Sequence, residues 1–398
     1  MQEERSPERY RAEISMLNHE IYELSQKLNE SESLRLKAVS SDKYDPFGNP
    51  TDYPGFTGDY SKICPKVGQP GYSLPLEPDP EERLNLRKFY SIGGWCFLFQ
   101  FVLANTGAML LSTLISSLIS GSGRLMSPAE ASDYMHSSSI TAGISMLVYM
   151  IFNVTVALFG MKWAGIRKSS LIHTKKFTAG KAVQYCLAAL LIWVVMLYAS
   201  TGIGLIFEKF GYTTKTISTA EMARTPLGFA VLTLYTSIIA PITEELFFRG
   251  MLLRVFSKAN QRFAVFATAF LFALSHKNIP QFLLAFGVGI FLAHITLIHG
   301  SIIPSIIVHI FINCFANIVQ QFAQSDPGTK LVEELIIVAF ALVGAVMLLA
   351  FMGSEKLPST TPKQSRRGFP LASSSLGVML SVVIPLAYSV YIFVSANR

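Results

Sequence analysis

Long apolar runs dominate the chain from residue 91 onward, separated by short polar stretches. A membrane-crossing helix needs roughly 20 consecutive apolar residues, and the runs are of that length. They cover residues 92–120, 139–162, 182–207, 226–253, 263–279, 281–298, 302–324, 331–353 and 371–395. The pattern predicts an all-α fold, a polytopic membrane helix bundle of about eight or nine transmembrane helices.

Residues 1–90 have a different pattern and predict a polar N-terminal region, with the transmembrane domain over 91–398. Apolar positions within 10–28 recur at intervals of four and three residues; they are Tyr10, Ile14, Leu17, Ile21, Leu24 and Leu28. This stripe predicts a short amphipathic or coiled-coil helix that could self-associate, and an isolated solvated helix is the alternative. Residues 44–80 are rich in Pro and Gly and predict an irregular linker.

Charge is distributed unevenly between the two regions. Residues 1–90 hold 12 Lys and Arg against 16 Asp and Glu, whereas residues 91–398 hold 21 against 10. The basic residues of the second region lie between apolar runs, where they anchor loops to a membrane face, so lipid rather than nucleic acid is the predicted contact. Their bias among alternate loops predicts a multi-pass protein of the cell membrane with a cytoplasmic N-terminus.

The stretch "PITEELFFRG" places Glu244, Glu245 and Arg249 inside an apolar run. A charge at that depth costs several kcal/mol, roughly 3 on insertion scales, so it requires a role. Glu245 and Arg249 are i and i+4 on a helix and can pair. Glu244 is five residues from Arg249, about 140° around the helix, and lacks that partner. We therefore predict that Arg249 holds Glu245, while Glu244 is available as a general base or acid.

Three further polar residues are predicted to reach the same depth. His276 follows Glu244 by 32 residues with Asn260 midway, so a turn at Asn260 makes two antiparallel helices that bring the pair together. His309 and Asn313 are again i and i+4, and they lie two to three helical turns into the predicted span 302–324. Each group alone is explained by helix–helix contacts. A carboxylate, two imidazoles and an amide at one depth favour a shared intramembrane cavity.

These residues resemble the motifs of the CAAX-protease and bacteriocin-processing (CPBP, or Abi) family of intramembrane proteases. "EELFFR" resembles its E-E-x-x-x-R motif, "FALSH" its F-x-x-x-H motif and "HIFIN" its H-x-x-x-N motif, in the family's order. One departure lies outside the motifs, where His299 precedes Gly300 and the family commonly has Thr. The resemblance covers residues 226–324, which we take as the catalytic core.

The resemblance implies hydrolysis of a peptide bond in a membrane-associated peptide or protein substrate, either prenylated or a leader peptide. Glu244 and His276 would activate water, and His309 and Asn313 would stabilise the oxyanion. The resemblance places Glu245 and Arg249 in the same catalytic motif.

Cofactor and function each have alternatives. We favour a reaction without a cofactor, although the family is often classed as metalloproteases and Glu244, His276 and His309 could ligate zinc. A non-catalytic scaffold or bacteriocin-immunity protein is the second hypothesis for function. A transporter is the third, because intramembrane ionisable groups also mark ion relays.

Overall fold

A computed structural model describes residues 7–40, 80–121, 127, 130, 140–173, 177–214, 226–322, 327–355 and 367–397. The regular elements within these ranges are all helices. They are α1 (Pro7–Ser40), α2 (Pro80–Gly121), α4 (Ile140–Ala164), η1 (Lys168–Leu171), α5 (Ala179–Lys209), α7 (Pro226–Leu234), η2 (Tyr235–Ile239), α8 (Ala240–Glu245), η3 (Leu246–Leu252), α9 (Leu253–Ser257), α10 (Gln261–Leu274), α11 (Ile279–His299), α12 (Ile303–Phe322), α13 (Pro327–Ser354), α15 (Phe369–Ala372) and α16 (Leu376–Ala396). The predicted linker, apart from its last residue, lies outside the described residues.

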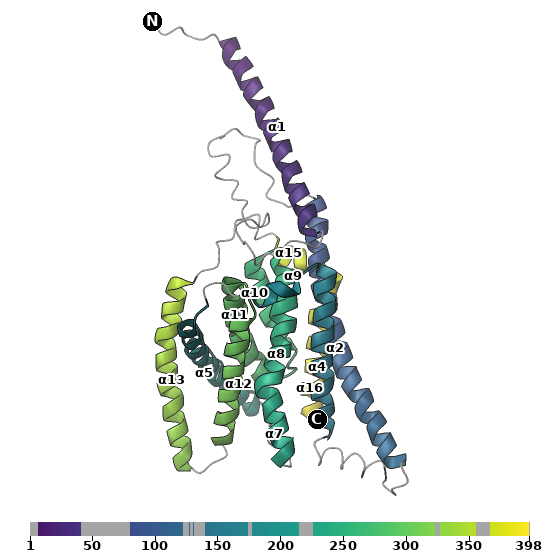
Figure 1. Cartoon of the computed structure of the whole chain (residues 1–398), viewed down its shortest axis with the longest axis vertical. Helices are drawn as coiled ribbons and strands as arrows, with labels where there is room; N and C mark the ends of the chain where they lie inside the picture. The colour runs from purple at the N-terminus through teal and green to yellow at the C-terminus, as the bar shows by residue number, and fades with distance from the viewer. Residues whose placement is uncertain are drawn as a thin grey trace.

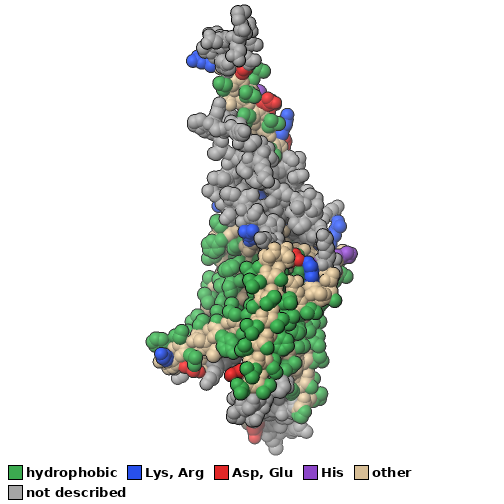
Figure 2. All heavy atoms as spheres, turned by 90° about the vertical axis from the view of Figure 1, so that its left-hand side faces the viewer, with side chains coloured by type: hydrophobic (Ala, Val, Ile, Leu, Met, Phe, Trp, Pro, Cys, Tyr) green, Lys and Arg blue, Asp and Glu red, His purple; other side chains and the backbone are tan. Residues whose placement is uncertain are grey.

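The predicted all-α membrane bundle is confirmed. Seven helices are long and apolar enough to cross a membrane, and two shorter apolar helices, Gln261–Leu274 and Ile303–Val319, fall on the remaining predicted runs. Apolar side chains cover most of the bundle surface seen in Figure 2. In Figure 1 the helices run alternately up and down, and α9, α15 and the first turns of α10 lie at the same end of the bundle. The side of the membrane that this end faces stays a prediction.

The first turns of α2 belong to the bundle core. Leu86, Phe89 and Tyr90 are buried, and the Tyr90 hydroxyl donates a hydrogen bond to the Arg367 carbonyl at 2.7 Å. Because α2 begins at Pro80, we place the proposed boundary between the polar region and the transmembrane domain before that residue rather than after residue 90.

α1 forms over the predicted heptad stripe and extends beyond it on both sides. It projects past the end of the bundle in Figure 1, and its stripe residues Ile14, Leu17 and Leu24 are exposed. Self-association through residues 10–28 therefore stays a prediction.

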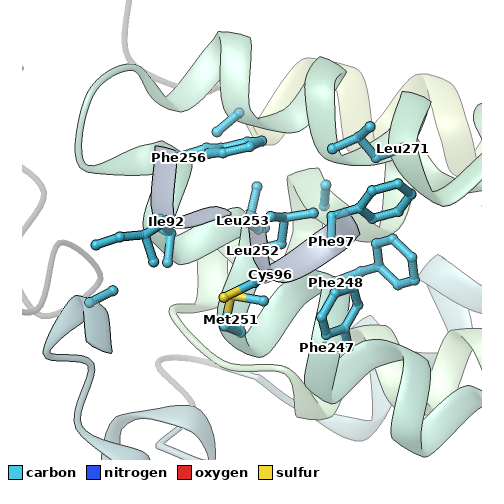
Figure 3. Close-up of a cluster of buried hydrophobic side chains, with 14 of the residues drawn as sticks. Ile92, Cys96, Phe97, Phe247, Phe248, Met251, Leu252, Leu253, Phe256 and Leu271 are labelled. Carbon is cyan, nitrogen blue, oxygen red and sulfur yellow. The ribbon is translucent and has the colours of Figure 1, made fainter. Parts of the chain in front are cut away.

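We call α8, η3 and α9 together the motif helix, because they carry the paired glutamates and Arg249. Apolar packing of residues 246–256, which follow the glutamates in the chain, anchors this helix. Figure 3 shows Phe247, Phe248 and Met251 among side chains of α2 and α10. Gly160 of α4 allows close approach there, since a Cβ at this position would lie 2.9 Å from the sulfur atoms of both Cys96 and Met251. Small residues of this kind let membrane helices pack tightly, so the motif helix has a fixed position.

Local irregularities surround the same helix. Two π-helical segments, η2 and η3, flank α8, and such segments often occur at functional sites. The predicted turn at Asn260 is confirmed, because its side chain caps α10 by accepting a hydrogen bond from the Phe263 amide at 2.8 Å. The predicted span 263–279 ends early: α10 stops at Leu274, and His276 lies in the turn that follows it.

Candidate active site

Glu245 and Arg249 form a buried ion pair, as their spacing predicts. The Arg249 guanidinium donates to Glu245 Oε1 at 2.8 Å, and both side chains are almost fully excluded from solvent. A second guanidinium nitrogen donates to the Gly289 carbonyl of α11 at 3.2 Å. Its Cζ atom lies 4.6 Å from the centroid of the Phe272 ring on α10. Arg249 thus connects the motif helix to both neighbouring helices.

His309 of α12 lies between the two glutamates. Its Nδ1 atom is 2.9 Å from Glu245 Oε1, and its Nε2 atom is 3.7 Å from Glu244 Oε2. A carboxylate paired with arginine can only accept a hydrogen bond, so Nδ1 carries the proton of this contact. Nε2 is therefore a lone-pair acceptor in the neutral ring and an N–H donor in the imidazolium form. In both forms the ring nitrogen that is left for further contacts, Nε2, lies near Glu244.

Glu244 differs from its neighbour in both exposure and partners. Its side chain is 25% exposed, against 0% for Glu245. Within the described part of the chain its one ion pair is the 3.7 Å contact with His309, which is longer than a hydrogen bond. Glu244 therefore keeps lone pairs for an incoming molecule.

His276 is held by the helix end before it. Its Nδ1 atom lies 2.9 Å from the Phe272 carbonyl, which only accepts, so this nitrogen carries a proton and Nε2 is left for other contacts. The Phe272 ring packs edge-to-face on both imidazoles, with centroids 5.0 Å from His276 and 5.7 Å from His309. Phe272, the first residue of "FALSH", thus separates the two rings and fixes their orientation.

Asn313 contacts the π-helical segment before the glutamates. Its amide donates to the Thr236 carbonyl at 2.9 Å, and one turn later Asn317 donates to the hydroxyls of Thr236 and Ser237 at 3.1 and 2.8 Å. The two asparagines attach α12 to η2 on the face that also carries His309. Asn313 retains a second N–H, so the predicted oxyanion role stays a hypothesis.

The described residues show no group of side chains that fits the alternative prediction of a zinc site. Among the described residues, no three His, Cys, Asp or Glu side chains are arranged to hold a metal ion, and Glu244, His276 and His309 are included in that search. We therefore derive no catalytic step through a metal.

Several buried polar groups near the site were not predicted from the sequence. Gln100 of α2 donates to Asn153 of α4 at 2.7 Å, and Asn153 approaches the Thr243 hydroxyl at 3.4 Å, next to Glu244. Single amides and hydroxyls in apolar runs are common and have no fixed spacing, so periodicity alone does not identify them.

The segment that contains the six predicted site residues also matches a protein family. Residues 226–315 match the family model described as type II CAAX prenyl endopeptidase Rce1-like. This segment is similar to the CAAX-protease family. The match confirms the family resemblance found in the three motifs and indicates a peptidase of CAAX-protease type within a multi-pass membrane protein. It runs from the start of α7 into α12, so α2, α4, α5, α13 and α16 lie outside it. No curated protein and no solved structure matches the chain.

Proposed function

We propose that this protein is an intramembrane endopeptidase in which Glu244 activates the attacking water. The unequal state of the adjacent glutamates carries the proposal. Glu245 is fully buried and neutralised by Arg249, whereas Glu244 is partly exposed and lies beside His309. A general base needs an accessible lone pair within reach of water, and Glu244 meets that requirement while Glu245 does not.

Water would be held between Glu244 and His276. Since Nδ1 of His276 donates to the Phe272 carbonyl, Nε2 of the neutral ring accepts a hydrogen bond from that water. Glu244 takes the other proton as the water oxygen attacks the carbonyl carbon of the scissile bond. The protonated Glu244 then returns the proton to the nitrogen of the leaving amine, which completes hydrolysis without a change in the enzyme.

His309 would stabilise the oxyanion as an imidazolium. Nδ1–H already donates to Glu245, so a second donor at Nε2 requires the charged ring. That charge is balanced locally, because two glutamates then face one guanidinium and one imidazolium. A preorganised donor to an oxyanion stabilises the transition state by about 2.7–4 kcal/mol. Asn313 would add its second amide N–H to the same oxygen.

As substrate we propose the prenylated C-terminal segment of a membrane-associated protein, the substrate class in the name of the matching family. The experiment compares membrane fractions from cells that express wild type and Glu244→Ala at equal levels. We expect uncut prenylated C-terminal peptides to accumulate with the variant. If bacteriocin-type leader peptides accumulate in their place, the substrate assignment is wrong. If the two proteomes are identical and purified wild type cleaves no membrane peptide, the endopeptidase function is refuted.

A further inference from the structure

Lys277, the residue after His276, is a half-buried cation in an unusual setting. Its Nζ atom donates to Asn105 Oδ1 at 2.8 Å and to the Tyr149 hydroxyl at 2.7 Å. Nζ also lies 5.0 Å from the centroid of the Tyr149 ring. The backbone φ of Lys277 is 63°, the left-handed region that non-glycine residues seldom adopt. The ammonium has three N–H donors, so one remains for another acceptor.

No carboxylate neutralises Lys277 within the described ranges. The ion pairs of these residues involve other side chains, among them Lys181 with Glu355 and Arg249 with Glu245. Lys277 also directly precedes Asn278, the N-cap of α11, and the positive end of a helix dipole disfavours a cation. A charge removed from water without an opposite charge is costly, so this position favours an anionic ligand.

The ammonium lies in the wall of an open cavity of about 420 Å³ that α2 and α4 line together with Lys277. Its walls carry amide and hydroxyl groups as well as apolar ones, among them Asn105, Ser112, Thr113, Ser145 and Tyr149. A volume in this range is typical of small-ligand pockets. A cation with one remaining N–H donor in a partly polar wall suits a small anionic group rather than a lipid chain.

The cavity adjoins the proposed water site. The Tyr149 hydroxyl of α4 accepts a hydrogen bond from Lys277, and one turn along α4 Asn153 donates to Thr243, the residue before Glu244. Lys277 is also covalently adjacent to His276. A peptide advances at most about 3.6 Å per residue, so a few residues of substrate would connect two neighbouring subsites of this kind. A bond cut close to the end of a chain leaves a carboxylate at that distance.

Resting on the proposed endopeptidase function, we propose that this cavity receives the C-terminal carboxylate of the substrate, with Lys277 as its counter-ion. The third N–H of Lys277 donates to the carboxylate. Lys277 is then a specificity-determining residue, which selects chains whose scissile bond lies near a free C-terminus. Asn105 and Tyr149 position its ammonium.

The test uses one fluorogenic farnesylated C-a-a-X peptide in two forms, with a free C-terminal carboxylate and with a C-terminal amide. Purified full-length protein in nanodiscs without anionic lipid should cleave the carboxylate form with a kcat/KM about tenfold or more above that of the amide form. Lys277→Gln should remove this preference, and Lys277→Arg should retain much of it. Asn105→Asp, which supplies an internal counter-ion, should also remove it while Lys277 is still present.

A binding measurement separates this inference from the proposed function. The same two peptides are titrated into Glu244→Gln protein, and the shift in melting temperature is recorded with and without Lys277→Gln. The carboxylate form should stabilise Glu244→Gln more than the amide form, and the difference should vanish in the double variant. If wild type cleaves neither peptide, the proposed function fails for this substrate and the binding result still decides the inference.

Two results would overturn the carboxylate site. One is equal cleavage and equal binding of the carboxylate and amide forms by wild type. The other is a loss of cleavage in Lys277→Gln that is the same for both peptides, which would assign Lys277 a structural role.

Discussion

The Nδ1 atom of His309 lies 2.9 Å from the Glu245 carboxylate oxygen that Arg249 already contacts. The Glu245 carboxylate therefore links α8 to η3, which carries Arg249, and to α12, which carries His309. We propose that Glu245 takes no part in the reaction and orients the His309 ring. This arrangement leaves Glu244, the preceding residue in the chain, as the carboxylate that faces the second nitrogen of the same ring.

Arg249→Ala should act through stability. It leaves Glu245 buried without its main counter-ion, and breaking a buried pair in this way costs about 3–5 kcal/mol. The melting temperature of purified protein in detergent should fall, and activity should fall with it. Arg249→Lys, which keeps the charge but not the two-armed contact with Glu245 and Gly289, should lie between. An Arg249→Ala protein that melts like wild type and is inactive would contradict this role.

His309→Ala should reduce kcat with little change in KM. Loss of one oxyanion donor lowers the rate by about 10²–10³-fold, because the donor acts on charge that develops only in the transition state. The control is His294→Ala. His294 lies on α11, and its Nε2 atom contacts the backbone carbonyl of Glu355 at 3.3 Å rather than Glu244 or Glu245. Steady-state kinetics with one peptide substrate give kcat and KM for both variants. A normal kcat in His309→Ala would refute the oxyanion assignment.

The ion pair and the antiparallel arrangement were accessible from the sequence because both depend on local geometry. The i, i+4 spacing of Glu245 and Arg249 determines their contact on a helix, and Asn260 is a recognisable helix cap. The nine apolar runs were long enough to be predicted by length alone, and each contains an apolar helix in the structure. These features need no knowledge of the tertiary packing.

The surroundings of the site were not predictable in the same way. The predicted span 263–279 extended beyond Leu274, whereas α10 ends at that residue and His276 lies in the following turn. The two π-helical segments beside Glu244 leave no sequence pattern of their own. Lys277 lies between apolar runs and resembles an ordinary loop lysine, and only the packing of α2 and α4 shows that it lines a cavity.

Removal of residues 1–78 should leave peptidase turnover largely intact. The core begins on α2, where Leu86 and Tyr90 are buried, and the site residues are all downstream of residue 240. The exposed apolar stripe of α1 is expected to affect oligomeric state, which size-exclusion chromatography with light scattering measures. A truncated protein that inserts and melts normally but cleaves nothing would contradict this division.

Chelation should leave the activity unchanged, because the proposed mechanism uses only Glu244, His276, His309 and Asn313. Elemental analysis of purified wild type should find less than one zinc ion per chain. The same measurement on His276→Ala and His309→Ala distinguishes the schemes, since each histidine would supply a ligand to a zinc site. One zinc per wild-type chain, lost from both variants together with activity, would refute the metal-free mechanism.

The central claim is that two adjacent glutamates have different tasks, and a paired comparison of Glu244→Gln and Glu245→Gln tests it most directly. Turnover of one verified peptide and melting temperature are measured on both purified variants. Glu244→Gln should lose turnover and keep the melting temperature of wild type, because Glu244 has no close partner in the described structure. Glu245→Gln should lower the melting temperature, because Arg249 loses its buried counter-ion. Normal turnover by Glu244→Gln would contradict the assignment of this residue as the base.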